Sequence, residues 1–111
     1  MVKYSEARLD GVFSALADPT RREVLRRLAR QEATVSELAQ GHELSLPGMM
    51  KHLDVLESAA LISTRKEGRR RVCRAEPESL RQAQLWISET ERFWTNALTA
   101  LDSYLKTELP Q

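Results

Sequence analysis

Two short amphipathic segments joined by a tight turn limit most strongly what this chain can fold into. Thr34 and Glu37 have the spacing of a capping box, in which each side chain satisfies a backbone amide at the start of a helix. A helix is therefore predicted to begin at Val35. Gly41 is predicted to interrupt this helix, with residues 41–43 forming the turn.

The second amphipathic segment starts with Ser45, a suitable N-cap, and Pro47 falls in the first helical turn, where a missing N–H costs nothing. One face is apolar and is predicted to be core: Met49, Leu53 and Leu56, with Leu46 on the flank in a core role. The other face carries small and basic groups: Pro47, Gly48, Met50 and Lys51. Residues of about 35–59 thus predict a helix-turn-helix whose second helix can enter a DNA major groove.

An arginine-rich hairpin is predicted at about residues 61–75. Leu61 to Lys66 forms one strand, Glu67 and Gly68 form the turn, and Arg69 to Ala75 returns. The hairpin carries six cations, which are Arg65, Lys66, Arg69, Arg70, Arg71 and Arg74. Residues 1–75 hold fourteen Lys and Arg against ten Asp and Glu, whereas residues 76–111 hold three against six. This distribution indicates a polyanion partner, with a nucleic-acid face placed away from an assembly face.

Two helices are predicted before the helix-turn-helix. Apolar residues at helical spacing predict the first, at about residues 5–17: Leu9, Val12, Phe13 and Leu16. Asp18 supplies an N-cap and Pro19 the first residue of the second helix. The arginines of this second helix, at positions 21, 22, 26, 27 and 30, are interpreted as a solvated face rather than as DNA contacts.

The last helix, at about residues 77–109, is predicted to begin at Pro77 and to be about 45 Å long. A heptad-like seam follows it: Ala83, Ile87, Thr90, Trp94, Ala97, Leu101 and Tyr104. Beside the seam lies a second apolar strip of Trp86, Phe93, Leu98 and Leu105. We expect one strip to pack against the domain and the other against a second copy; the alternative is that both pack internally. The predicted dimer contacts are Val12, Phe13, Ile87, Trp94, Ala97, Leu101 and Tyr104.

Length predicts a single domain over residues 1–111. The elements predicted along the chain make this domain mainly α with a small β-hairpin wing: a winged helix-turn-helix with a long C-terminal dimerisation helix. No apolar run is long enough to span a bilayer and the amino terminus lacks the apolar core of a signal peptide, so a cytoplasmic location without membrane association is expected. A lone cysteine, Cys73, agrees with a reducing compartment. No phosphate-binding glycine loop, nucleophile elbow or acid–base pair occurs, and we predict no enzyme activity.

Several motifs follow one another along the chain: Leu16–Arg21 with Val24, Leu25 and Leu28; Ser36–Ala39; Leu44, Ser45, His52, Leu53, Leu56, Ala59 and Leu61; and Gly68 with Arg69 at the wing tip. In this order they resemble the motifs of the ArsR/SmtB-type winged helix-turn-helix repressors of bacteria and archaea. The likeness covers Val12 to Ala75 by residues and the last helix by pattern. The resemblance implies a dimer joined through its first and last helices that blocks a promoter until a signal releases it. The helix after Ser45 would read bases and the wing would contact phosphates.

The sequence departs from this family at three places. Leu46 and Met50 stand where many relatives have glutamine and serine, so contact with thymine methyl groups would replace part of the hydrogen-bond readout. Ala60 stands where the family has glycine, and a left-handed conformation there would cost about 1 kcal/mol. Residues 34–36 replace the Cys-Val-Cys segment of the metal sensors, and the last helix has no histidine. No metal or cofactor is predicted.

Three residues with possible ligand chemistry do not form a ligand spacing. His42 is interpreted as a turn residue, and His52 either fixes the second helix or contacts a phosphate. Cys73 is either a small apolar filler or a redox sensor whose pKa would be lowered by Arg71 and Arg74.

We therefore predict a sequence-specific, homodimeric transcriptional regulator that represses a promoter. It would bind a pseudo-palindromic duplex whose half-sites lie about 34 Å apart. The predicted DNA contacts are Ser45, Pro47, Gly48, Met50, Lys51, His52, Arg69, Arg70 and Arg71. Two alternatives are a winged-helix module that binds another protein through its long helix, and a metal-responsive repressor with an atypical site.

Overall fold

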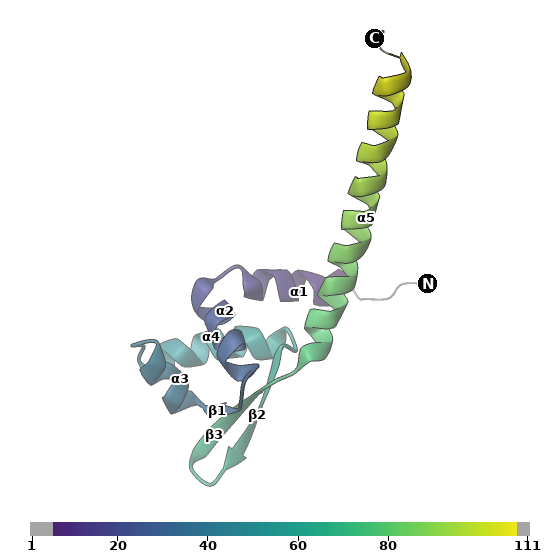
Figure 1. Cartoon of the computed structure of the whole chain (residues 1–111). Coiled ribbons are helices and arrows are strands. Elements are labelled where there is room, and N and C mark those ends of the chain that lie inside the picture. Colours follow the sequence, from purple (N-terminus) through teal and green to yellow (C-terminus); the bar gives the residue numbers. More distant parts are fainter. Residues whose placement is uncertain (1–5, 109–111) are drawn as a thin grey trace.

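The computed structural model of the chain describes residues 6–108 and confirms a mainly α fold with a small β wing. The elements follow in the order α1 (Glu6–Leu16), α2 (Pro19–Leu28), β1 (Ala33–Thr34), α3 (Val35–Gly41), α4 (Leu46–Ser58), β2 (Ile62–Glu67), β3 (Arg70–Ala75) and α5 (Pro77–Glu108). Helices α1 to α4 and the sheet form a body, and α5 projects from it (Figure 1). The molecule is 73 Å long and 33 Å across for this reason.

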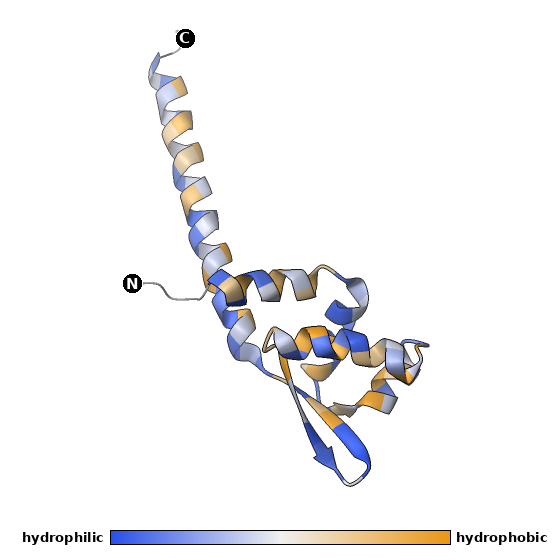
Figure 2. Cartoon of the chain, turned by 180° about the vertical axis from the view of Figure 1, so that it is seen from behind, coloured by the Kyte–Doolittle hydropathy of each residue, from blue (hydrophilic) through white to orange (hydrophobic). Residues whose placement is uncertain are grey.

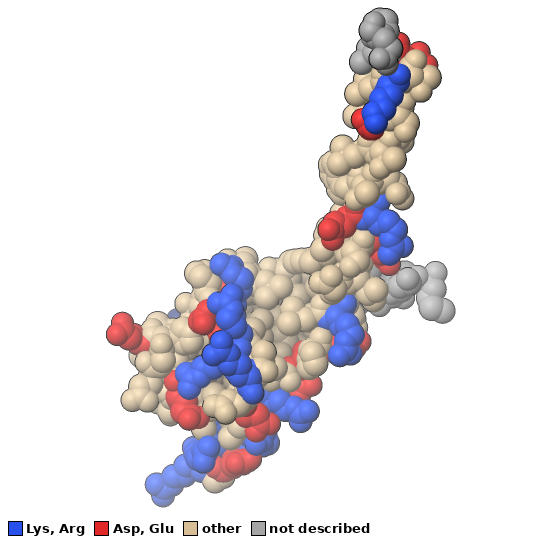
Figure 3. Space-filling model, viewed as in Figure 1, with Lys and Arg blue, Asp and Glu red and all other residues tan. Residues whose placement is uncertain are grey.

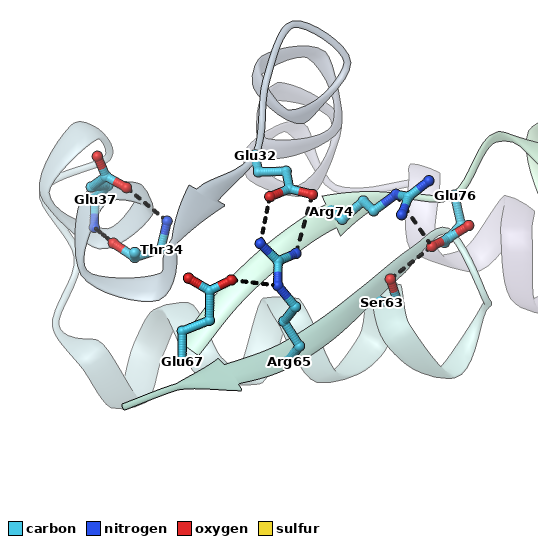
Figure 4. Close-up of polar contacts among 8 residues, drawn as sticks. All are labelled: Glu32, Thr34, Glu37, Ser63, Arg65, Glu67, Arg74 and Glu76. Atoms are coloured by element: carbon cyan, nitrogen blue, oxygen red, sulfur yellow. Dashed lines mark hydrogen bonds and ion pairs between the residues drawn. The ribbon is translucent and has the colours of Figure 1, made fainter. Parts of the chain in front are cut away.

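Helix starts in the body are fixed by side-chain caps, as the sequence predicts. Asp18 Oδ2 accepts a hydrogen bond from the Arg21 amide at 3.0 Å, and Pro19 begins α2. At α3 the predicted capping box is confirmed, because Thr34 Oγ1 accepts from the Glu37 amide at 3.1 Å and Glu37 Oε1 accepts from the Thr34 amide at 2.8 Å (Figure 4). Each cap satisfies an amide that the helix leaves unpaired.

The end of α3 differs from the prediction. The helix continues through Gly41, and the left-handed residue is Glu43, with a φ of 55°. The Glu43 amide donates to Gln40 O and the Leu44 amide to Ala39 O, which is the pattern of a Schellman motif. Because the left-handed position follows the helix by two residues, the turn is set by these hydrogen bonds and not by the location of the glycine.

Helix α4 ends in the same motif. The Ala60 amide donates to Glu57 O at 2.9 Å and the Leu61 amide to Leu56 O at 3.0 Å. Ala60 has a φ of 58°, which confirms the left-handed conformation considered from the sequence. Leu56 and Leu61 are both buried, and an apolar contact between these two positions commonly accompanies the motif.

The core lies between the four body helices and the sheet. Met49, Leu53 and Leu56 are at most 1% exposed, which confirms the predicted inner face of α4. Leu46 is 51% exposed, so its predicted core role is wrong. It is the first residue of α4, and its side chain lies toward the wing instead of the body. Val12 is 1% exposed within its own core, which contradicts its predicted contact with a second copy.

The sheet has three antiparallel strands in the order β1-β3-β2. The sequence indicated only the hairpin of β2 and β3; β1 was missed because two residues are too short for an alternating pattern. It pairs with the base of the wing through Ala33 opposite Cys73 and Thr34 opposite Val72. The wing turn lies one residue later than predicted, with Gly68 at a φ of 64° and Glu67 paired with Arg70.

Helix α5 leaves the body after its first three turns. Ser79 and Ala83 are its buried residues, and each described residue from position 91 onward is exposed. Figure 2 shows apolar segments continuing along the projecting part. The expectation that one strip packs against the domain is therefore wrong beyond about Thr90, because the described body does not reach that far.

Candidate nucleic-acid interface

A hollow separates the start of α4 from the wing and brings several predicted site residues together. We call it the wing hollow; it has a volume of about 660 Å³. Residues from three elements line it: Thr34 to Glu37 at the start of α3, Leu46 and Met50 on α4, and Arg69, Arg70 and Arg71 on the wing. The three arginines therefore stand across the hollow from the helix predicted to read DNA.

The outer face of α4 is exposed along its first turns. Ser45, Pro47 and Lys51 are exposed, Gly48 is half-buried, and Met50 is half-buried and packs against the core. Ser45 Oγ accepts a hydrogen bond from the Gly48 amide at 3.1 Å, so this hydroxyl caps the helix. The exposed start of the helix therefore carries small side chains, and Lys51 is the cation on this face. A DNA groove can accommodate such a helix start.

His52 connects α4 to the start of α2. Its Nδ1 lies 3.3 Å from Arg21 Nη1 and 3.8 Å from Asp18 Oδ2. The Arg21 amide, followed by His52 and the Arg21 guanidinium, holds the pKa of Asp18 below its usual value. These contacts support the first of the two predicted roles, which is to fix α4 in place. The phosphate contact of His52 stays a prediction.

Arginines of α2 serve the body. Arg21 Nε donates to Ala15 O at 2.8 Å, Arg22 Nη1 to Leu16 O at 2.7 Å, and Arg27 Nη1 to Glu37 O at 3.0 Å. These guanidinium groups satisfy carbonyls at the end of α1 and in α3. The interpretation of these side chains as structural rather than DNA-binding agrees with the contacts.

Four of the six wing cations divide into two groups according to whether they have an ion-pair partner. Arg65 donates to both oxygens of Glu32 at 2.7 and 3.1 Å, and its Nε donates to Glu67 at 2.7 Å (Figure 4). The bond from Arg65 holds the pKa of Glu32 below its usual value, so both groups stay charged. Arg65 is thus neutralised within the protein, which the sequence did not indicate because Glu32 lies outside the hairpin.

The other group consists of Arg69, Arg70 and Arg71. All three are exposed, and within residues 6–108 none has an ion-pair partner. Figure 3 shows Lys and Arg side chains gathered at the end of the wing. Three unpaired guanidinium groups beside one hollow provide bidentate donors suited to phosphate oxygens.

Cys73 does not have the properties of a redox sensor. Its side chain is fully buried where β3 pairs with β1. Burial, followed by the Glu57 carboxylate, raises the pKa of the thiol to about 11. The predicted lowering by neighbouring arginines is wrong, since Arg71 opposes the shift only weakly and burial dominates. The thiol is a small apolar filler.

The described part of the chain holds no group of three or more His, Cys, Asp and Glu placed to bind a metal ion. His42 Nδ1 lies 2.9 Å from Leu38 O, which agrees with its interpretation as a turn residue. None of the described helices is long and apolar enough to cross a membrane.

Comparison with known proteins identifies the chain as similar to helix-turn-helix transcriptional regulators. A family model described as a helix-turn-helix domain matches residues 16–65. The chain is 38% identical over 99 residues to the HTH-type transcriptional regulator Rv2034 of Mycobacterium tuberculosis, covering 89% of this chain and 90% of that protein. Two further curated relatives, matched over 54% and 51% of this chain, are named as transcriptional repressors.

Solved structures agree. The crystal structure of an ArsR family transcriptional regulator superposes with a TM-score of 0.79 at 46% identity, covering 86% of this chain and 97% of that one. A homodimeric winged helix-turn-helix DNA-binding domain from Mycobacterium bovis, a possible ArsR-family regulator, superposes with a TM-score of 0.63 at 26% identity over 84% of this chain and 94% of that one. Fold, site and relatives together place the chain in the ArsR/SmtB family of winged helix-turn-helix transcriptional regulators, which are DNA-binding proteins rather than enzymes.

Proposed function

We propose that the protein is a homodimeric repressor that binds a pseudo-palindromic operator in the cytoplasm and catalyses no reaction. The repressor names of two relatives and the homodimeric state of one structural neighbour support this. Two copies of α4 related by a twofold axis would enter successive major grooves, about 34 Å apart.

The wing hollow is the observation that carries the proposal. It places Arg69, Arg70 and Arg71 on one side and the first turns of α4 on the other. With α4 in the major groove, the wing would lie along the adjacent backbone, and its unpaired arginines would hold phosphates. Ser45, Pro47, Gly48 and Met50 would line the groove, His52 would lie at its edge, and Lys51 would contact bases. The exposed Leu46 and the half-buried Met50 suit contact with thymine methyl groups.

Dimer formation follows from the exposed apolar side chains of α5. Trp94, Leu101 and Tyr104 are 52 to 62% exposed, and Phe93 is 70% exposed. Contiguous apolar surface of this kind marks an association site. A second copy would cover it through Ile87, Trp94, Ala97, Leu101 and Tyr104, with Phe13 beside the seam. Phe13 packs edge-on against Trp86, with the ring centroids 5.6 Å apart.

Fluorescence anisotropy with a duplex selected from genomic DNA tests the wing. Replacing Arg70 and Arg71 by glutamine should weaken binding to every duplex and lower the slope of log K against log salt by about 1.8 per half-site. Arg26→Gln with Arg81→Gln removes the same charge from exposed positions outside the wing hollow and should leave that slope unchanged. Equal slopes for the two double variants would contradict the phosphate role.

Lys51→Ala tests base readout. This variant should bind the selected duplex and a scrambled duplex with more similar affinities than the wild type, because a direct base contact is worth about 1 to 3 kcal/mol of discrimination. An unchanged ratio of the two affinities would exclude Lys51 from base readout.

Sedimentation of the wild type and of Leu101→Glu tests the dimer: the variant should be monomeric at concentrations where the wild type is dimeric.

A further inference from the structure

A second pocket lies where the body joins α5. We call it the junction pocket; it has a volume of about 540 Å³, within the range of sites for small organic ligands. Its lining comes from the end of α2, the loop before β1, the end of β3 and the first turn of α5. It shares no lining residue with the wing hollow.

The interior of the junction pocket is apolar. Leu25, Leu28 and Leu61 form it from the body side and are at most 9% exposed. Leu80 and Pro77 contribute from α5, and Leu80 remains 41% exposed although it lies beside this core. A ligand with an apolar body would cover Leu80 and remove that surface from water.

The rim of the junction pocket has four charged groups, and their partners differ. Both oxygens of Glu32 accept hydrogen bonds from Arg65, and Glu76 Oε2 accepts one from Ser63 Oγ at 2.7 Å (Figure 4). The two carboxylates are therefore satisfied.

The guanidinium groups of Arg30 and Arg74, unlike the two carboxylates, lack a side-chain hydrogen bond among the described residues. Arg74 Nε lies 3.9 Å from Glu76 Oε2, beyond hydrogen-bond distance, and the guanidinium of Arg30 has no hydrogen-bond or ion-pair partner within the described residues. Arg74 still forms an ion pair with Glu76, and Arg65 pairs with Glu32. Among the described residues, Arg30 is therefore the rim cation that has no carboxylate partner, and a ligand carboxylate would supply one.

The elements around the junction pocket connect the reading helix to α5. Leu61 lies three residues after the end of α4, and its carbonyl accepts a hydrogen bond from the Glu76 amide at 2.9 Å immediately before α5 begins. A ligand seated here lies between the body, which carries α4, and the helix through which the proposed dimer forms. A change in the angle between them would alter the separation of the two reading helices, on which operator binding depends.

We propose that the junction pocket is the effector site of this repressor and that it binds a small carboxylic acid with an apolar body, whose occupancy lowers operator affinity. This rests on the proposed function. The ligand acts only through a difference in its affinity for the DNA-competent and released arrangements, and couplings of this kind are typically about 5- to 150-fold.

Isothermal titration calorimetry of the full chain with decanoate tests the site, with decanol as the uncharged probe. Decanoate should bind once per protomer, and decanol at least about tenfold more weakly. Arg30→Gln should weaken decanoate binding about tenfold, and Ala29→Trp, at an exposed lining position, should block it. Arg26→Gln is the matched control, since Arg26 lies one turn earlier on α2, pairs with Glu23 and does not line the pocket.

Equal binding of decanoate by the Arg30→Gln and Arg26→Gln variants, or no saturable binding at all, would overturn the site.

Operator affinity is then measured by anisotropy with and without decanoate. It should fall at least fivefold for wild type and Arg26→Gln but stay constant for Ala29→Trp. Decanoate binding without a change in operator affinity would overturn the effector role. If the ligand-free protein bound no DNA, the proposed repressor function would be refuted. The calorimetry would still test whether the junction pocket binds the ligand.

Discussion

The left-handed alanine at the end of α4 gives a quantitative test of the structure. Ala60 has a φ of 58°, and a left-handed conformation costs an L-residue about 1 to 2 kcal/mol. Ala60→Gly removes this cost. Glycine also makes the unfolded chain more flexible, however, which offsets about 0.4 to 1 kcal/mol of the gain. The midpoints of these ranges give a net gain of about 0.8 kcal/mol in the free energy of unfolding. The Schellman hydrogen bonds of Ala60 and Leu61 do not change this gain, because they involve only the backbone.

The assay is thermal and urea unfolding followed by circular dichroism at one fixed protomer concentration, since dimerisation couples stability to concentration. A gain of this size raises the melting temperature by about 2 to 5 °C in a domain of this length. Glu43→Gly offers an independent repeat at a φ of 55°. The two sites lie at opposite ends of α4, about 20 Å apart, so their effects should add.

Ala59→Gly is the matched control for Ala60→Gly. Ala59 has a φ of −84° and is buried, so glycine there relieves no strain and should lower stability by about 1 kcal/mol. Opposite signs at two adjacent alanines are expected only if the second one alone is left-handed. A loss of stability in Ala60→Gly similar to that in Ala59→Gly would refute the assigned helix end.

Three further outcomes follow from the contacts. Thr34→Ala should lower the free energy of unfolding by about 1 kcal/mol through loss of the α3 cap, as measured by urea titration. The bond from the Thr34 amide holds the pKa of Glu37 below its usual value, so the stability that this bond contributes is present above the usual pKa and is lost as the pH falls through the folded pKa. Glu37→Gln should therefore flatten the dependence of stability on pH between 5 and 3. Cys73 should resist iodoacetamide at pH 8 in the folded protein and react once urea unfolds it.

Features that depend on neighbouring residues in the chain were predictable from the sequence. The caps at Asp18, Thr34 and Ser45 each use an amide three residues away, so the sequence alone contains both partners. The inner face of α4 was predictable for a related reason, because helical periodicity determines which residues share a face. Predictions that required a partner from elsewhere in the fold were less successful.

Leu46 and Arg65 illustrate the second kind. The apolar side chain of Leu46 fits a core position by type, but the residue begins its helix on the side that faces the wing. Arg65 was counted among the six hairpin cations that indicated a polyanion, yet Glu32, thirty-three residues earlier, neutralises it. In both cases the local pattern is compatible with two environments, and the packing of β1 against β3 brings in the residues that decide between them.

In the seam of helix α5, helical periodicity decides which residues share a face, but contacts from elsewhere decide which of them are buried. Periodicity places Ala83 and Leu101 on the same face, yet Ala83 is 2% exposed and Leu101 is 52% exposed. The body covers the seam near its start, where α5 contacts α1, and a surface outside the single chain must cover the rest. One continuous apolar pattern therefore serves two successive interfaces. The angle at which α5 leaves the body sets how they are joined, so a ligand in the proposed effector site, at this joint, would alter the spacing of the two reading helices.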